Sequence, residues 1–265
     1  MIISFVGSGN VATHLAWAFH AAGHEIAGIY SRSQAMAEML ARQVGAAAVT
    51  DIRHLPASDV YIFAVKDSVL PSLAEQFGGI EGDSLLVHTA GSMPLFVFGR
   101  KVRRCAVLYP LQTFSKARAV DMRTVPCFVE GNNEESLHLV TDLARSISEH
   151  VEKLDGDKRR YLHLSAVFAC NFVNHCYAIA ADILEQQGLD ARVLQPLMAE
   201  TAAKAKDMTP REAQTGPAVR FDQKVMSAHE KMLDGNASRA AIYKLMSSSI
   251  HDFYRNKEKE DHDKL

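Results

Sequence analysis

The fold is decided by residues 2–12, which read IISFVGSGNVA. The first five of these residues are mostly apolar and rich in β-branched and aromatic side chains, which is typical of a buried strand. The run GSGNVA follows at once, and small and apolar residues then recur at helical spacing as far as Ala22. Gly23 stands where a glycine C-cap would end that helix. The stretch therefore predicts a strand, a tight glycine turn and a helix in direct succession.

The turn has the pattern Gly-x-Gly-x-x-Ala, which can cradle a pyrophosphate group. Gly7 permits the tight turn, Gly9 lets the backbone approach the phosphates, and Ala12 keeps the helix close to the sheet. The phosphates would then lie on unpaired N–H groups at a helix N-terminus, where the helix dipole favours negative charge. Similar turns occur in flavodoxin-like and methyl-transferring sheets, but the position of this turn between a strand and a helix favours a dinucleotide.

Strands and helices alternate through the first half of the chain. We expect strands over residues 2–6, 25–30, 60–65, 85–88, 105–109 and 127–130, a brief strand at Val49, and helices over residues 12–22, 34–44 and 134–148. Because such alternation is typical of parallel sheets, the pattern predicts a Rossmann-type, doubly wound parallel sheet.

The pattern changes in the second half of the chain. From Lys158 onward the sequence shows no convincing strand, and we expect helices over residues 161–187, 191–208, 217–233 and 238–254, with breaks at glycine and proline. The predicted fold class is therefore α/β: an N-terminal Rossmann-type doubly wound parallel sheet followed by an all-α C-terminal domain. We place the boundary near Asp155, with a dinucleotide-binding domain over residues 1–155 and a helical substrate and dimerisation domain over residues 156–265.

The end of the second strand distinguishes between two dinucleotides. An NAD site usually carries Asp or Glu about 20 residues after the turn, where it binds the ribose 2′-hydroxyl. Here the strand ends in YSRS (residues 30–33), which contains no carboxylate. Arg32 can stack on adenine and meet a 2′-phosphate, and the hydroxyls of Ser31 and Ser33 can donate beside it. The sequence therefore predicts NADP as the cofactor.

Two further segments follow strands whose carboxyl ends should meet at the same edge of the sheet. The run AVKD (residues 64–67) should pass along the ribose and phosphates, and HTAGS (residues 88–92) should approach the nicotinamide. His88 is either a catalytic group or an ordinary hydrogen-bonded structural histidine. The residues expected to bind the cofactor are Gly7, Ser8, Gly9, Asn10, Val11, Ser31, Arg32, Ser33, Val65, Lys66 and Thr89.

Polar residues interrupt the first apolar helix of the second half. They are His163, Asn171, Asn174 and His175. The last three are three or four residues apart and share one helix face. Amides on a buried helix need hydrogen-bond partners, because an unsatisfied buried polar group is costly. Either a neighbouring helix, within the chain or in a second copy, or a substrate supplies these partners, and the sequence leaves both open.

A second polar segment, QTGPA (residues 214–218), is a turn that opens a helix. Backbone N–H groups of this turn together with Arg220 would form an anion pocket suited to a carboxylate, or else a plain helix cap with a surface ion pair. The residues expected to contact a substrate are Ser92, Gln214, Gly216 and Arg220.

The sequence resembles a bacterial family that joins a Rossmann-like domain to a helical domain of unknown function. The resemblance covers nearly the whole chain and rests on GSGNVA (residues 7–12), YSRS (30–33), VKD (65–67), VHTAGS (87–92), YPLQTFS (109–115), FACNFVNH (168–175) and QTGPA (214–218). Members are described as NADP oxidoreductases because they are similar to deazaflavin-dependent NADP oxidoreductases. The resemblance implies a cofactor rather than a particular reaction.

More distantly, the chain is similar to pyrroline-5-carboxylate reductases and β-hydroxyacid dehydrogenases. Those families imply a Rossmann half, a helical half like the C-terminal domain of 6-phosphogluconate dehydrogenase, a substrate crevice between the halves, and dimerisation through the helical half. The first family carries Gly-Ser-Gly-Pro where this chain has FACN (residues 168–171). The second uses a lysine four residues before an asparagine, where this chain has Val167 or Cys170. Neither known substrate therefore carries over.

These observations favour an NADPH-dependent reductase of a small C=O or C=N compound that bears a carboxylate. His163, His175 or His88 would donate the proton, since histidine titrates near neutral pH. Asn171 and Asn174 would orient the reacting group. The alternative is a non-catalytic NADP-binding or redox-sensing protein that docks a partner through its helical domain.

Composition indicates where the protein acts and which partners it lacks. The chain has 265 residues and a formal net charge of −2, so no basic field would attract nucleic acid. No run of about 18 apolar residues is present, so we expect no membrane span. The four cysteines lack Cys-x-x-Cys spacing and are expected to be buried, reduced thiols that bind no metal. The first strand begins at Ile2, which leaves no room for a signal peptide. We therefore expect a cytoplasmic homodimer that acts on a small molecule.

Overall fold

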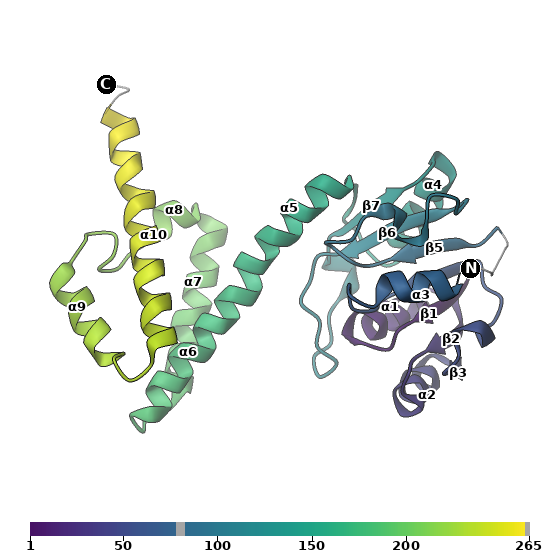
Figure 1. Cartoon of the computed structure of the whole chain (residues 1–265), viewed down its shortest axis with the longest axis horizontal. Helices are drawn as coiled ribbons and strands as arrows, with labels where there is room; N and C mark the ends of the chain where they lie inside the picture. The colour runs from purple at the N-terminus through teal and green to yellow at the C-terminus, as the bar shows by residue number, and fades with distance from the viewer. Residues whose placement is uncertain (78–82, 263–265) are drawn as a thin grey trace. The chain divides into compact units, whose positions relative to one another are not determined.

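The computed structural model describes residues 1–77 and 83–262, with side chains as far as Arg255 in the last helix. The chain divides into two compact units, Met1–Phe172 and Val173–Leu265. The first unit contains a β-sheet and the second is helical (Figure 1). The predicted fold class, a Rossmann-type sheet followed by a helical region, is confirmed.

An eight-stranded sheet forms the centre of the first unit. Its order is β3-β2-β1-β4-β5-β6-β7-β8, in which the chain reverses direction across the sheet after β3. This reversal places the carboxyl ends of β1 and β4 side by side, where open α/β sheets bind ligands. The strands are β1 (Ile2–Val6), β2 (Glu25–Tyr30), β3 (Ala47–Val49), β4 (Val60–Phe63), β5 (Leu85–His88), β6 (Cys105–Pro110), β7 (Cys127–Gly131) and β8 (Val151–Lys153).

One pair of strands departs from the predicted parallel sheet. β6 and β7 are antiparallel, whereas every other neighbouring pair in the sheet is parallel. The connection between them, residues 111–126, contains one 3-10 turn, η3 (Met122–Thr124), and no α-helix. A parallel pair needs a crossover connection, which is usually an α-helix. Because this connection has none, β7 returns beside β6 in the opposite direction.

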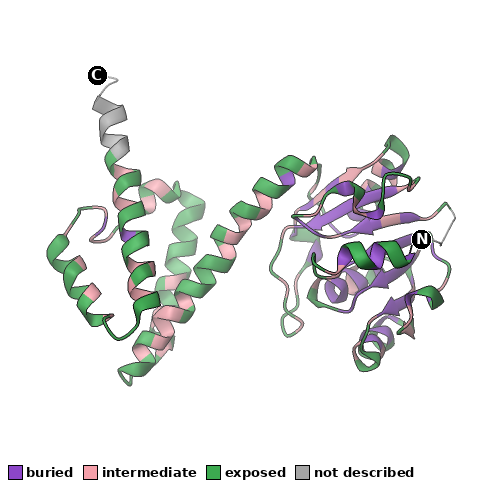
Figure 2. Ribbon diagram, in the orientation of Figure 1, coloured by how far each residue is buried: buried purple, intermediate pink, exposed green. Residues whose placement is uncertain are grey.

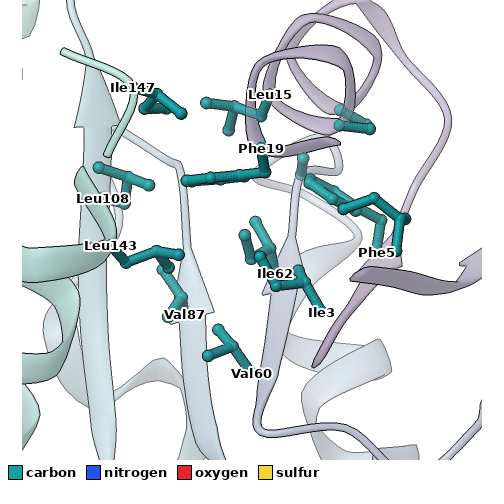
Figure 3. Close-up of a cluster of buried hydrophobic side chains, with 14 of the residues drawn as sticks. Ile3, Phe5, Leu15, Phe19, Val60, Ile62, Val87, Leu108, Leu143 and Ile147 are labelled. Atoms are coloured by element: carbon teal, nitrogen blue, oxygen red, sulfur yellow. The ribbon is translucent and has the colours of Figure 1, made fainter. Parts of the chain in front are cut away.

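Two hydrophobic clusters fill the two faces of the sheet. The first lies under α1 (Asn10–Ala21), α2 (Gln34–Val44) and α4 (Glu134–Arg145), and Figure 3 shows Leu15 and Phe19 of α1 among strand residues such as Ile62. The second lies under α3 (Leu70–Phe77) and the 3-10 turn η2 (Leu95–Phe98). Because successive strand side chains point to opposite faces, β4 contributes Ile62 to the first cluster and Phe63 to the second.

The predicted helices match closely in the first unit, with one omission. α2 has the expected bounds, and α1 begins two residues earlier than predicted because Asn10 already follows the glycine turn. α3 was not predicted from the sequence; its eight residues form a short amphipathic helix after β4. Another 3-10 turn, η1 (Ile52–His54), precedes β4.

One continuous helical stretch, Gly156–Gln186, leads from the first unit into the second. It consists of α5 (Gly156–Ala166), a π-helical segment η4 (Val167–Phe172) and α6 (Val173–Gln186). By length and composition this helix could cross a bilayer, and it is the one described helix for which that holds. A single helix of this kind does not assign a membrane, because core and interface helices of soluble proteins have the same composition.

The second unit has little core of its own. Only Ala218 and Ser247 are buried among its described side chains, and Figure 2 shows its helices mostly exposed or half-buried. All four cysteines are free, but the prediction that they are all buried is wrong: Cys170 is half-buried and Cys176 is exposed, because few side chains cover the helix that carries them. The remaining elements are η5 (Ala191–Leu194), α7 (Gln195–Asp207), α8 (Pro210–Ala213), α9 (Gln223–Met232) and α10 (Ala237–His262).

Candidate active site

The turn between β1 and α1 requires glycine at its first position. Gly7 has φ of 122°, a conformation that side chains with a Cβ rarely adopt. A Cβ placed there would lie 2.4 Å from the carbonyl oxygen of Ala64 on β4. The Gly7 N–H in turn donates to the Tyr30 carbonyl oxygen at 2.9 Å. The turn is therefore wedged between β2 and β4, which fixes its position at the carboxyl edge of the sheet.

The N-terminus of α1 fits a phosphate group. Gly9 is the N-cap, and no side chain caps the first turn. The first turn carries no acidic residue, and a Cβ at Gly9 would meet nothing within 4 Å. Free N–H groups, the positive end of the helix dipole and open space beside Gly9 together form an anion site.

A cleft of about 570 Å³ opens from this turn along the carboxyl ends of five strands. Most of the predicted cofactor residues line it. Ser33 does not, and instead precedes α2, where its N–H donates to the Ser31 hydroxyl at 3.3 Å. The predicted residues in the lining are Gly7, Ser8, Gly9, Asn10, Val11, Ser31, Arg32, Val65, Lys66 and Thr89.

Arg32 gives the end of β2 the charge that a 2′-phosphate requires. Its side chain is exposed, lines the cleft, and has no ion-pair partner among the described residues. The YSRS stretch that ends this strand carries no carboxylate to accept a ribose 2′-hydroxyl. The residues present therefore fit NADP.

His163, on α5, lines the same cleft. A Cβ on Gly91 would lie 2.7 Å from the His163 Nδ1, so only glycine lets the imidazole pack against the loop after β5. The Tyr109 hydroxyl at the end of β6 lies 3.0 Å from the same nitrogen. Burial raises the pKa of Tyr109, so its hydroxyl stays protonated and can donate to Nδ1. In the neutral imidazole this hydrogen bond leaves the proton on Nε2.

A second pocket of about 520 Å³ adjoins the cleft. The two share Tyr109, Gln112 and His163 as lining residues. The second pocket continues along α5 and the π-helical segment to Asn171, and its other lining residues are apolar or uncharged. His163 therefore lies where a dinucleotide cleft meets a pocket of small-molecule size.

His88 has a different position from His163. It is fully buried and accepts a hydrogen bond from the Ala90 N–H at 3.2 Å. Burial, and next the positive charge of Arg159, lowers its pKa to about 3. The ring therefore stays neutral and holds the turn after β5, while Thr89, Ala90 and Gly91 line the cleft. Ser92 also lies outside the lining and donates a hydrogen bond to Asp67.

The other predicted residues belong to the second unit. Asn174 and His175 are exposed on α6, and Arg220 is exposed with no described ion-pair partner. Gly216 has φ of 112° in the turn before Pro217, and the Gln214 amide donates to the Thr215 carbonyl oxygen at 3.0 Å. The cleft and the second pocket are formed by the first unit without these residues. Among the described residues, no group of His, Cys, Asp or Glu could hold a metal ion.

Two residues that line both pockets, Tyr109 and Gln112, were not predicted from the sequence. Both lie in the stretch YPLQTFS (residues 109–115), for which no role in the site was predicted. The signal available was their position at the end of a buried strand and just after it, at the carboxyl edge where ligands bind.

The two halves of the chain match two family models. Residues 2–91 match the model described as NADP oxidoreductase coenzyme F420-dependent, and residues 125–250 match a domain of unknown function, DUF2520. No curated protein matches the chain. The first range contains most of the residues that line the dinucleotide cleft. The second contains the last two strands of the sheet, β7 and β8, and most of the helical region.

Three solved structures illustrate the relationships. A Bacteroides fragilis protein described as an NADP oxidoreductase is 40% identical, with a TM-score of 0.91 over 95% of this chain and 98% of that one. A Thermotoga maritima protein is 24% identical, with a TM-score of 0.70 over 97% and 99% of the two chains. A pyrroline-5-carboxylate reductase from Coxiella burnetii is 18% identical, with a TM-score of 0.58 over 96% and 93%, and this likeness concerns the fold alone.

The predicted family resemblance is confirmed by these matches, and so is the predicted cofactor. The chain belongs to the family of the Bacteroides fragilis protein, an NADP oxidoreductase family in which a Rossmann-type domain is followed by a DUF2520 helical domain.

Proposed function

We propose that the protein is an NADPH-dependent reductase of the C=O or C=N bond of a small molecule that bears a carboxylate. The observation that carries the proposal is the position of His163, which lines both the dinucleotide cleft and the adjoining pocket and is hydrogen-bonded to Tyr109. Residues 1–155 would form the dinucleotide-binding domain, and residues 156–265 the substrate and dimerisation domain.

The reaction needs a hydride and a proton. NADPH supplies the hydride when it is bound. In its imidazolium form, His163 would donate the Nε2 proton to the oxygen or nitrogen of the reduced bond and remain as a neutral imidazole, while Nδ1 stays hydrogen-bonded to the Tyr109 hydroxyl. Tyr109 is a positioning residue, which fixes the ring orientation. Asn171, at the end of the second pocket, would orient the reacting group through its amide.

We propose a carboxylate-binding site in the second unit. Arg220 and the turn at Gly216 offer a cation and backbone N–H groups, with Gln214 beside them. Asn174 and His175 would extend the polar face that begins at Asn171. Ser92 would contact the substrate only after leaving its hydrogen bond to Asp67. We assign His88 to holding the loop that lines the cleft, because its pKa of about 3 does not suit a proton donor at neutral pH.

We propose that the helical half forms a homodimer. Large apolar side chains are exposed along the Gly156–Gln186 helix, including Leu164, Phe168 and Phe172, and the second unit exposes others such as Leu197. Exposed apolar surface of this extent marks an interface. A soluble, cytoplasmic dimer agrees with the four free thiols and with a net charge of −2, which offers no attraction to nucleic acid.

The same exposed helical surface favours a second candidate. A non-catalytic NADP-binding or redox-sensing protein would use it to dock a different protein. In that case His163 would hold the loop at Gly91 through its packing and would transfer no proton.

Turnover distinguishes the two candidates. The purified protein is mixed with NADPH and a panel of 2-oxo acids and cyclic imino acids, and NADPH consumption is followed. We expect at least one compound to be reduced, and His163→Gln to lower kcat by at least about 100-fold while NADPH affinity stays within about twofold. His54→Gln, which changes an exposed histidine outside both pockets, serves as the matched control. Equal turnover by His163→Gln and the unmodified protein would contradict the proposal.

A further inference from the structure

The loop after β6 lies against the glycine turn. Three hydrogen bonds join residues 114–116 of this loop to the turn and to α1. The Asn10 amide donates to the Phe114 carbonyl oxygen at 2.8 Å, and the His14 Nε2 lies 3.0 Å from the Ser115 carbonyl oxygen. The Lys116 ammonium donates to the Ser8 carbonyl oxygen at 2.8 Å. We call residues 111–118 the clasp loop.

One face of α1 holds the clasp loop in place. Asn10, His14 and Trp17 are four and three residues apart and so lie on the same side of the helix. His14 is almost fully buried, with its ring 4.9 Å from the Phe114 ring and 5.2 Å from the Trp17 ring. Contacts this specific between segments about 100 residues apart in sequence indicate that the loop has one defined position.

This position places a cation at the glycine turn. Lys116 is half-buried and has no carboxylate partner among the described residues. An ammonium group has three N–H donors, and the Ser8 carbonyl uses one of them. Ser8 and Asn10, the two residues of the turn region that the clasp loop contacts, both line the cofactor cleft. Lys116 therefore has free donors and an uncompensated charge next to the phosphate-binding end of α1.

We propose that Lys116 is a pyrophosphate-binding residue of the NADP site, held there by the clasp loop. The pyrophosphate carries two negative charges, whereas a helix N-terminus supplies only about half a positive charge. Two cations line the cleft: Arg32 stands at the end of β2, where the 2′-phosphate is expected, and Lys66 follows β4, where it would supply one charge along the phosphates. The Lys116 ammonium meets this need through charge-assisted hydrogen bonds to the phosphate oxygens. The inference rests on NADP binding at the cleft and not on any particular substrate.

Two ligands separate this role from a general effect on the site. 2′-AMP contains the adenosine and the 2′-phosphate, whereas 2′-phospho-ADP-ribose also contains the pyrophosphate. Both are titrated in competition with NADPH, whose own affinity is measured for each variant by its fluorescence. Lys116→Met removes the charge and keeps the aliphatic stem, and Lys116→Arg keeps a cation. Arg118→Met removes an exposed cation of the same loop that has no described side-chain bond, and it is the matched control.

We expect Lys116→Met to weaken 2′-phospho-ADP-ribose by about tenfold and 2′-AMP by less than twofold. Lys116→Arg should restore most of the lost affinity, and Arg118→Met should bind both ligands as the unmodified protein does. An unchanged affinity of Lys116→Met for 2′-phospho-ADP-ribose would overturn the proposal. So would equal weakening of both ligands, because the lysine would then support the shape of the cleft and not the pyrophosphate. Failure of the unmodified protein to bind NADPH would instead contradict the cofactor assignment.

Discussion

At the scale of single residues, the two glycines of the turn have different tasks. Gly7 cannot carry a Cβ, because of its positive φ and its approach to Ala64, whereas Gly9 has an ordinary backbone conformation and open space around it. Gly7 is therefore required by the fold itself. Gly9 is required only when a phosphate occupies the space beside it.

Alanine substitution should separate these two tasks. We expect Gly7→Ala to lower both the thermal unfolding temperature and NADPH affinity, with a stability loss of about 2 kcal/mol or more from strain and overlap. Gly9→Ala should keep the unfolding temperature within about 2 °C and weaken NADPH by at least about tenfold. Thermal unfolding and NADPH titration of both variants measure this. Tight NADPH binding by Gly9→Ala would mean that the phosphates do not approach this turn.

His88 makes the stability of the protein sensitive to acid. Burial lowers its pKa from the ordinary 6.5 to about 3, so the unfolded chain binds the proton more readily than the folded one. The contribution of the neutral ring to the free energy of unfolding is thus fully present above pH 6.5. It is lost as the pH falls toward 3, and the free energy of unfolding decreases by about 1.4 kcal/mol for each pH unit in this range. We expect His88→Gln to reduce this loss in urea unfolding at pH 7.5 and pH 5. Parallel pH profiles for the two proteins would show that His88 does not titrate in this way.

At the scale of elements, Arg159 determines where α5 meets the sheet. Its side chain is 1% exposed, pairs with Glu130 on β7, and donates to the Met93 carbonyl oxygen at 2.7 Å. His163 lies one helical turn further along α5, on the same face as Arg159. The ion pair therefore anchors the helix in the position that brings His163 to Tyr109 and Gly91.

Loss of this anchor should affect stability and turnover together. Arg159→Met leaves Glu130 without its charge partner, and we expect unfolding free energy to fall by about 3 kcal/mol. Turnover should fall as well, with NADPH affinity less affected, because His163 loses its fixed position. Arg160→Met breaks an exposed pair with Asp157 and should cost less than about 0.5 kcal/mol. Urea unfolding and kcat of both variants test the contrast, and similar losses in the two variants would argue against the anchor.

The sequence predicts those parts of the fold and site that depend on local spacing. The glycine turn, the YSRS strand end and the helix α2 are each visible within about ten residues. The direction of β7 depends on the whole connection before it, and three-residue β8 is too short to show a pattern. The pair of Tyr109 and His163 joins residues 54 positions apart. Residue spacing along the sequence does not predict a contact between such distant residues, so this hydrogen bond could be found only in the structure.

At the scale of the whole molecule, the helical region buries too few apolar side chains to be stable without a further interface. Its described part buries two side chains and exposes many large apolar ones. We expect light scattering at micromolar concentration to give twice the chain mass of 29.2 kDa, with a total interface of at least about 2,000 Å². Phe168→Glu places a charge on the exposed face and should shift the protein toward monomer. A monomeric mass for the unmodified protein would rule out the proposed dimer.

The central claim is that NADP lies in the cleft of the first unit with its nicotinamide end toward His163. A crystal structure with bound NADP⁺ tests it most directly. We expect the pyrophosphate at the turn of residues 7–10, the 2′-phosphate at Arg32 and the nicotinamide beside Gly91. The His163 Nε2 should lie within about 5 Å of the position beside the nicotinamide ring that the reacting atom of a substrate would occupy. An NADP⁺ molecule whose nicotinamide points away from His163, or whose 2′-phosphate has no contact with Arg32, would contradict the account.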